Sequence, residues 1–69
     1  MPYILVQVTD EDVTDSQKAA IIKGATDLMV DVLGKEPQRT FVVIQEVPLA
    51  NWGVGGLPVD KFRRQASSG

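Results

Sequence analysis

Two short segments of the chain have the hydrophobic pattern of β-strands. Residues 3–9 are rich in β-branched and aromatic side chains and end in polar residues, which is typical of a strand. One of its predicted faces is apolar throughout, whereas the other becomes polar toward its end. Residues 40–46 form a second predicted strand, which is apolar on both faces and ends before Pro48.

The segment between these strands has the spacing of an amphipathic helix. Apolar residues recur every three or four positions across residues 16–33, which predicts a helix with one broad apolar face. The helix is expected to begin after Thr14, because Gln17 three residues later completes an S/T-x-x-E/Q capping box. Gly34 is expected to end it, since glycine readily adopts the left-handed conformation common at helix C-termini, and Pro37 follows.

The last part of the chain is rich in turn-forming and polar residues. Residues 51–56 are glycine-rich and are expected to form a turn. Residues 57–62 are expected to form a short hairpin arm. Residues 63–69 are polar, and we expect residues 65–69 to form a flexible tail.

A strand, a helix and a second strand in this order predict a βαβ unit. Its strands should be parallel and its crossover right-handed. A chain of 69 residues allows one small domain. The predicted fold class is therefore α/β, with a single domain over residues 1–69, parallel strands and a C-terminal hairpin arm.

Such a unit leaves apolar surface uncovered. One helix can cover only one face of two strands, yet the second strand is apolar on both faces. A two-stranded sheet is not stable by itself, and a chain of this size buries only about 60% of its unfolded surface. We therefore expect each chain to be a protomer of an obligate oligomer, with sheets extended or packed between subunits.

Composition excludes several kinds of site and partner. The chain has 0 Cys and 0 His, which excludes a disulfide framework, a zinc finger, a Cys or His nucleophile and most transition-metal sites. A net charge of -2 without a basic stripe argues against nucleic acid. No apolar run is long enough to span a bilayer, and no cationic segment precedes the first apolar stretch. We expect a cytoplasmic protein that binds neither nucleic acid nor membrane.

Few side chains could carry chemistry. The glycines of residues 53–56 follow no strand-to-helix turn and lack a P-loop lysine, so a tight turn is the better interpretation than a phosphate site. Asp10, Glu11 and Asp12 are expected to be a solvated charge run rather than an acid–base pair or a cation site. Glu46 ends an apolar strand, and both a structural hydrogen-bonding role and a catalytic role are open to it.

Pro2 is the most unusual chemical group in the sequence. Methionine aminopeptidases remove Met1 before small residues such as proline, which would leave a secondary amine at the start of the first strand. An α-amino group has a pKa of about 7.7–8.0, and an apolar pocket lowers that pKa by penalising the charged form. A base with a pKa close to the working pH suits proton abstraction next to a carbonyl.

Together these features resemble the 4-oxalocrotonate tautomerase family. Pro2 opens a hydrophobic strand, and Trp52-Gly53-Val54-Gly55-Gly56 forms an aromatic-Gly-aliphatic-Gly-Gly segment after the second strand. The helix start Asp15-Ser16-Gln17-Lys18 is similar to the family's Asp-Glu-Gln-Lys. The resemblance covers residues 2 to about 64. It implies βαβ units with a hairpin arm, assembled as a homo-oligomer in which three dimers make a hexamer.

The resemblance also implies roles for three residues. Pro2 matches the amino-terminal proline that moves a proton along a dienol–ketone system without metal or cofactor. Trp52 matches the family's hydrophobic aromatic residue, which helps to keep the pKa of the proline low. Thr9 matches the residue at the end of the first strand whose backbone N–H binds substrate.

The family's two substrate-binding arginines are not at their matched positions. The first match falls in Asp12-Val13 and the second on Phe41. Arg39 precedes Phe41 by two residues and so shares its face in an extended segment. Arg39 is therefore our candidate for binding a substrate anion, and an exposed loop arginine is the alternative. Arg63 and Arg64 are expected to be tail or interface residues.

The sequence thus predicts a small isomerase that converts an enol or dienol of a 2-oxo acid to its ketone. Because the two arginines are missing, we expect a smaller or less charged enol, or a monoacid, as the substrate. One alternative is a tautomerase-fold oligomer without catalysis, which would serve as a structural or partner subunit. Another is a relative of the haloacrylate dehalogenases, whose chemistry needs a carboxylate to activate water.

Overall fold

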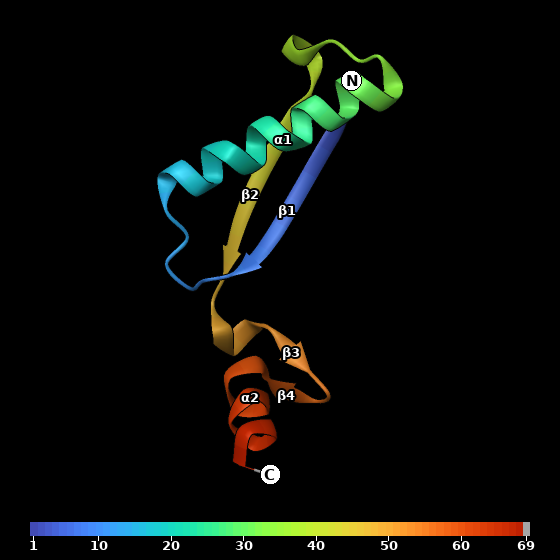
Figure 1. The fold of residues 1–69 in the computed structure, drawn as a ribbon. Helices are drawn as coiled ribbons and strands as arrows, with labels where there is room; N and C mark the ends of the chain where they lie inside the picture. The colour runs from blue at the N-terminus through green and yellow to red at the C-terminus, as the bar shows by residue number, and fades with distance from the viewer. Residues whose placement is uncertain (69) are drawn as a thin grey trace.

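The fold is a βαβ unit followed by a small hairpin and a second helix (Figure 1). The computed structural model describes residues 1–68. The elements in chain order are β1 (Tyr3–Thr9), α1 (Asp15–Leu33), the short 3-10 helix η1 (Pro37–Arg39), β2 (Phe41–Val47), a second short 3-10 helix η2 (Leu49–Asn51), β3 (Gly53–Val54), β4 (Leu57–Pro58) and α2 (Val59–Ser68).

The two long strands pair in parallel, as the sequence predicts. Their register matches Tyr3 with Phe41 at one end and Thr9 with Val47 at the other. Helix α1 crosses one face of this sheet (Figure 1). The α/β fold class, with parallel strands and a C-terminal hairpin, is confirmed.

The ends of α1 are formed by the predicted residues. The Thr14 hydroxyl accepts from the Gln17 N–H at 3.1 Å, and the Thr14 N–H donates to the Gln17 side chain at 2.9 Å. These two bonds form the capping box. The helix starts at Asp15, one residue before the segment 16–33 that has the apolar repeat. Gly34 ends α1 in the left-handed conformation, with φ of 64°.

The sheet face opposite α1 is open. Two large side chains near the strand starts are widely exposed, with Tyr3 at 62% and Phe41 at 48%. Leu5 and Val43 pair next along this face and are also exposed. At the polar end of this face, the Gln7 side-chain amide donates a hydrogen bond of 2.7 Å to the Gln45 side chain. The uncovered apolar face expected from the second strand is therefore present.

The hairpin lies earlier in the chain than the sequence suggested. Gly55 and Gly56 both have positive φ, 60° and 85°, which is the pattern of a two-residue type I′ turn. The turn therefore falls between β3 and β4, and only the first two residues of the expected arm, 57–62, are strand. The expected arm over residues 57–62 is therefore wrong for residues 59–62, because these residues begin α2.

Helix α2 extends through most of the segment expected to be frayed. Asp60 lies in its first turn, where the helix dipole favours a negative charge, and pairs with Arg64 at 3.6 Å. The Phe62 ring lies against Gly55, since a Cβ at Gly55 would be 3.4 Å from it. The flexibility expected of residues 65–69 stays a prediction, and Gly69 lies outside the described residues.

The protomer is extended and has almost no interior. Its radius of gyration is 15.8 Å, whereas a compact domain of this length has a radius of about 11 Å. Among the side chains of residues 1–65, only Val59 is buried, at 5% exposure. No helix within residues 1–68 is long and apolar enough to cross a membrane.

Candidate active site

Pro2 lies at the edge of the sheet where both long strands begin. Its carbonyl accepts a hydrogen bond of 2.9 Å from the Phe41 N–H, which fixes the start of β1 against the start of β2. In the full chain the Pro2 nitrogen is an amide joined to Met1. The free amine expected at this position therefore depends on the removal of Met1.

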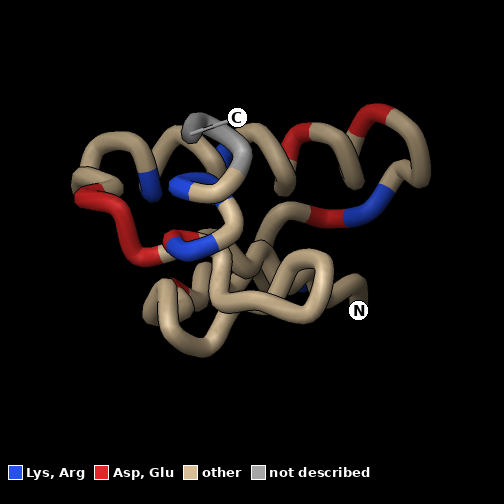
Figure 2. Tube along the Cα trace, turned by 90° about the horizontal axis from the view of Figure 1, so that it is seen from below, with Lys and Arg blue, Asp and Glu red and all other residues tan. Residues whose placement is uncertain are grey.

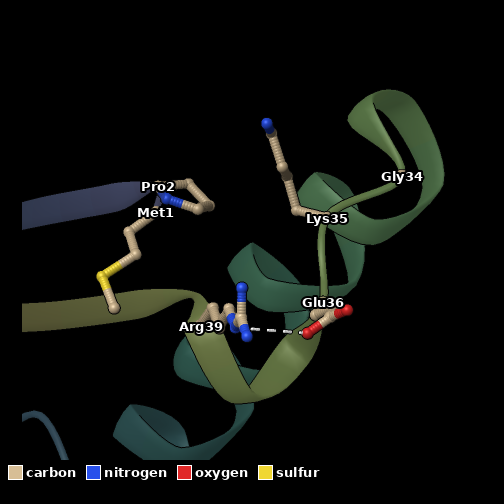
Figure 3. Close-up of a pocket in the computed structure, with 6 residues that line it drawn as sticks. All are labelled: Met1, Pro2, Gly34, Lys35, Glu36 and Arg39. Carbon is tan, nitrogen blue, oxygen red and sulfur yellow. Dashed lines mark ion pairs between the residues drawn. The ribbon is translucent and has the colours of Figure 1, made fainter.

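A pocket of about 230 Å³ adjoins Pro2. Its lining comes from the start of the chain and from the connection between α1 and β2, and comprises Met1, Pro2, Gly34, Lys35, Glu36 and Arg39 (Figure 3). The pocket thus combines the candidate base with two cationic side chains and one carboxylate.

Arg39 lies in this pocket within the same chain as Pro2. It is the last residue of η1, directly before the second strand. Its Nε lies 3.4 Å from Oε2 of Glu36, and both side chains are largely exposed, at 70% and 67% (Figure 3). The structure therefore brings the two predicted residues Pro2 and Arg39 together, with Glu36 as the ionic partner of Arg39.

Sequence reasoning missed Lys35. In a βαβ unit the connection after the helix returns to the edge where the first strand starts, because parallel strands begin at the same edge. The residues between Gly34 and Phe41 must therefore lie near Pro2. The predicted βαβ topology could therefore have placed Lys35, as well as Arg39, near Pro2.

Thr9 and Trp52 lie at the opposite end of the protomer. Thr9 is seven positions after Pro2, and a rise of about 3.3 Å per strand residue separates them by about 23 Å. Trp52 follows η2, beyond the end of β2 (Figure 1). A single chain therefore does not bring Thr9 and Trp52 to Pro2.

The Thr9 backbone N–H faces the free edge of β1. The next N–H along, that of Asp10, donates to the Val47 carbonyl at 2.8 Å. Because successive residues of a strand direct their N–H groups to alternate sides, the Thr9 N–H points away from β2. It is thus placed to donate to a group outside this chain, as the predicted backbone role requires.

Trp52 is half-buried and held by its backbone. Its carbonyl accepts from the Val59 N–H at 2.7 Å, and its own N–H donates to Leu49 at 3.2 Å. These bonds fix the backbone of Trp52 at the junction between η2 and the start of α2.

A cationic side chain, that of Arg63, also lies at the Thr9 end of the protomer. It comes from the segment that was expected to be a tail or an interface. Arg63 of α2 pairs with Glu11, whose carboxylate also accepts a hydrogen bond from the Thr9 hydroxyl. Figure 2 shows the acidic loop after β1 beside basic positions of α2. The hydrogen bond from Arg63, followed by that from Thr9, lowers the pKa of Glu11. Arg63 is therefore an intrachain contact, and Glu11 is not merely a solvated charge.

Glu46 has a structural partner. Lys18, in the first turns of α1, pairs with it directly. The hydrogen bond from Lys18 lowers the pKa of Glu46, and the same bond raises the pKa of Lys18. Of the two roles open to Glu46, the structural one is favoured, because its carboxylate links the end of β2 to α1.

Comparison with known proteins identifies the family. The family model described as "Tautomerase enzyme" matches residues 2–61. The chain is 48% identical to "Probable tautomerase K2" of Dickeya dadantii, over 97% of this chain and 100% of that protein. It is 33% identical to a 2-hydroxymuconate tautomerase of Pseudomonas putida, over 93% and 100%.

A solved structure agrees with this relationship. The crystal structure of DmpI from Helicobacter pylori superimposes with a TM-score of 0.85 at 38% identity, covering 91% of this chain and 97% of that one. The fold and the sequence thus place the chain in the tautomerase class. The chain belongs to the 4-oxalocrotonate tautomerase family. This membership supports a tautomerase activity.

Proposed function

We propose that the protein is a cofactor-free tautomerase that converts an enol or dienol of a 2-oxo acid to its ketone. The observation that carries this proposal is the pocket in which Pro2 and Arg39 lie together. A secondary amine beside a cationic group offers both a proton carrier and a partner for an acidic substrate.

Pro2 is the base and then the acid of the proposed reaction. Once Met1 is removed, the Pro2 nitrogen takes the proton of the enol hydroxyl. The O–H electron pair forms the π bond of the carbonyl, and the π pair of the enol C=C bond moves, directly or along the dienol, to the carbon that will be protonated. The Pro2 ammonium then returns the proton to that carbon. The step moves one proton and changes no oxidation state, so it needs no co-reactant.

Arg39 is proposed to bind the carboxylate of the substrate. A carboxylate that enters a partly apolar pocket loses hydration, so it needs a cation or several N–H donors in compensation. Arg39 already holds Glu36 through an exposed ion pair, and exposed pairs are weak enough for a substrate carboxylate to compete.

Thr9 and Trp52 are proposed to serve a Pro2 pocket in another subunit. Thr9 is about 23 Å from Pro2 along its own strand, and Trp52 lies beyond the same end of the sheet, so both reach such a pocket only by assembly. The free edge at Thr9 and the apolar face at Tyr3 and Phe41 support a homo-oligomer, and we propose a hexamer. In that arrangement the Thr9 N–H binds substrate and Trp52 forms an apolar wall.

The replacement Pro2→Ala tests the proposed base. A primary amine differs in basicity and freedom, and loss of general-base catalysis typically costs about 10²–10⁴-fold in rate. We therefore expect ketonisation of phenylenolpyruvate to fall by that order, with an unchanged circular dichroism spectrum. Intact mass must first show that Met1 is absent from both proteins.

Pro48→Ala is the matched control, because Pro48 is an exposed proline at the start of η2, away from the pocket. It should keep the wild-type rate. A processed Pro2→Ala protein that works at the wild-type rate would remove Pro2 from the mechanism. A processed wild-type protein without activity on phenylenolpyruvate or 2-hydroxymuconate would favour the non-catalytic oligomer.

A further inference from the structure

We propose that Lys35 is a second substrate-binding cation of the Pro2 pocket, and that it selects substrates with a carboxylate next to the reacting enol. This inference rests on the proposed function and adds a residue and a substrate class to it. Nothing in the hydrophobic pattern of the sequence marks Lys35, which follows the capping residue Gly34 of α1 in an exposed connection.

The charges around Pro2 favour Lys35 as the available cation. The charged side chains that line the pocket are Lys35, Glu36 and Arg39. Glu36 pairs with Arg39, whereas no acidic side chain of residues 1–65 pairs with Lys35. The pocket therefore carries one positive charge in excess, and Lys35 is the group that provides it without first giving up an internal partner.

The backbone fixes where Lys35 emerges. Its N–H donates to the Met29 carbonyl at 3.3 Å, while the Gly34 N–H donates to the Val30 carbonyl at 3.0 Å. This pair of bonds, with Gly34 in the left-handed conformation, is the Schellman arrangement that turns a chain sharply out of a helix. In Figure 3 the Lys35 side chain extends from this turn between Gly34 and Pro2, and its Nζ points away from Glu36 and Arg39.

A cation in this position has two physical effects. It offers a charge-assisted hydrogen bond to a substrate carboxylate, which is stronger than a neutral one. It also disfavours a second positive charge nearby, so on this proposal it favours the neutral form of the Pro2 amine once Met1 is removed, as Arg39 would, while Glu36 would act in the opposite sense. Binding and proton transfer therefore both depend on Lys35, and each can be measured separately.

Kinetics on a matched pair of substrates test the proposal. Phenylenolpyruvate carries a carboxylate beside the enol, and its methyl ester carries none. We expect Lys35→Met to lower kcat/KM for the acid by about tenfold, mainly through KM, since the cation is exposed and partly screened. The ester should change far less. Lys35→Arg should restore most of the loss, because it restores the charge.

The pH profile of kcat/KM supplies a readout that a structural role would not move. This profile reports the pKa of the free enzyme's base. Lys35→Met should shift its acidic limb to higher pH, because a neighbouring positive charge is lost. Lys35→Arg should leave that limb near its wild-type position.

Lys23→Met is the matched control. Lys23 is an exposed lysine of α1 that pairs with Asp27 at 2.7 Å, outside the pocket. It should leave both substrates and the pH profile unchanged. If Lys35→Met behaves like Lys23→Met on both substrates, Lys35 is a surface residue and the proposal is overturned.

Calorimetry separates this proposal from the proposed function. The saturated acid 3-phenylpropanoate cannot tautomerise, so its binding reports the anion site alone. We expect its affinity to drop severalfold in Lys35→Met and to be kept in Pro2→Ala. Such a drop supports Lys35 even if Pro2→Ala remains active, whereas equal affinities for Lys35→Met and wild type overturn it even if Pro2→Ala is inactive.

Discussion

Single residues fix the geometry of the Pro2 pocket. The Pro2 carbonyl accepts from Phe41 and sets where β1 begins, while Gly34 turns the chain out of α1 toward the pocket. Only a residue that tolerates positive φ holds this turn without strain, and Gly34 has φ of 64°. The position of Lys35 is therefore tied to the identity of its neighbour.

Gly34→Ala tests this dependence. An L-residue in the left-handed region costs about 1–2 kcal/mol, so we expect the free energy of unfolding to fall by that amount. Gly24→Ala is the control: Gly24 lies inside α1 with open space around it, and alanine should add about 0.5–1 kcal/mol there. Urea unfolding at one fixed protein concentration measures both. The same change in the free energy of unfolding in both variants would contradict the assigned role of Gly34.

Residue-level predictions succeeded where the signal was local in sequence. Thr14 and Gln17 form the predicted capping box because the motif acts within one helical turn. Lys35 was not predicted as a site residue. Its place beside Pro2 depends on the sheet edge to which the connection between α1 and β2 returns, which is not a local signal. Whether Pro2, Arg39, Thr9 and Trp52 act as proposed stays a prediction.

At the scale of elements, α2 is joined to the βαβ unit by a charged contact. Arg63 binds Glu11 in the loop after β1, and Thr9 holds the same carboxylate. The Val59 N–H binds the Trp52 carbonyl at the other end of this contact region. The packing of α2 should therefore depend on the charge of Glu11.

The pH dependence of this contact has a definite sign. Because Arg63 lowers the pKa of Glu11 in the folded chain, the contact contributes fully above the ordinary glutamate pKa. Its contribution is lost as the pH falls through the lowered pKa. Fluorescence of the single tryptophan, Trp52, should therefore show an acid transition in the wild type that Glu11→Gln lacks.

Asp31→Asn provides the control for that titration, since Asp31 lies on the exposed side of α1. Its transition should match the wild type. If Glu11→Gln keeps the full acid transition, the Arg63–Glu11 contact does not hold α2 in place.

The long elements were predictable from the sequence and the short ones were not. β1, α1 and β2 have enough residues for a periodic pattern to identify them, and their observed bounds differ from the prediction by about one residue. β3 and β4 have two residues each, so no period exists to place them. The two glycines that make the turn were visible, but no local pattern marked the change to helix after Pro58, where the Phe62 ring lies against Gly55.

At the scale of the whole molecule, the protomer lacks a core of its own. Its accessible surface is 5094 Å², whereas a compact monomer of this mass exposes about 4,250 Å². The excess lies partly on the open sheet face, where Tyr3 and Phe41 are exposed. In the proposed homo-oligomer, burial of this face between subunits would supply the stability that the protomer lacks.

Stability should therefore depend on protein concentration. For a dimer that unfolds as it dissociates, a tenfold rise in concentration adds about 1.4 kcal/mol, or roughly 3–5 °C in Tm. We expect this rise for each tenfold step between about 1 and 100 µM, and a loss of assembly in Leu5→Asp, which charges the open face. Sedimentation of the wild type as a folded monomer, with a constant Tm, would contradict the obligate oligomer.

Met1 is 85% exposed, and the hydrogen bonds between β1 and β2 begin at the Pro2 carbonyl rather than at its nitrogen. A prolyl amide has no N–H, so removal of Met1 breaks no bond of the sheet. On the proposed mechanism, a newly made chain can fold and assemble as an inactive precursor, and a peptidase then activates each subunit. Activity would be set by the fraction of chains that have lost Met1. Any residue that a fusion tag leaves before Pro2 would keep the enzyme inactive.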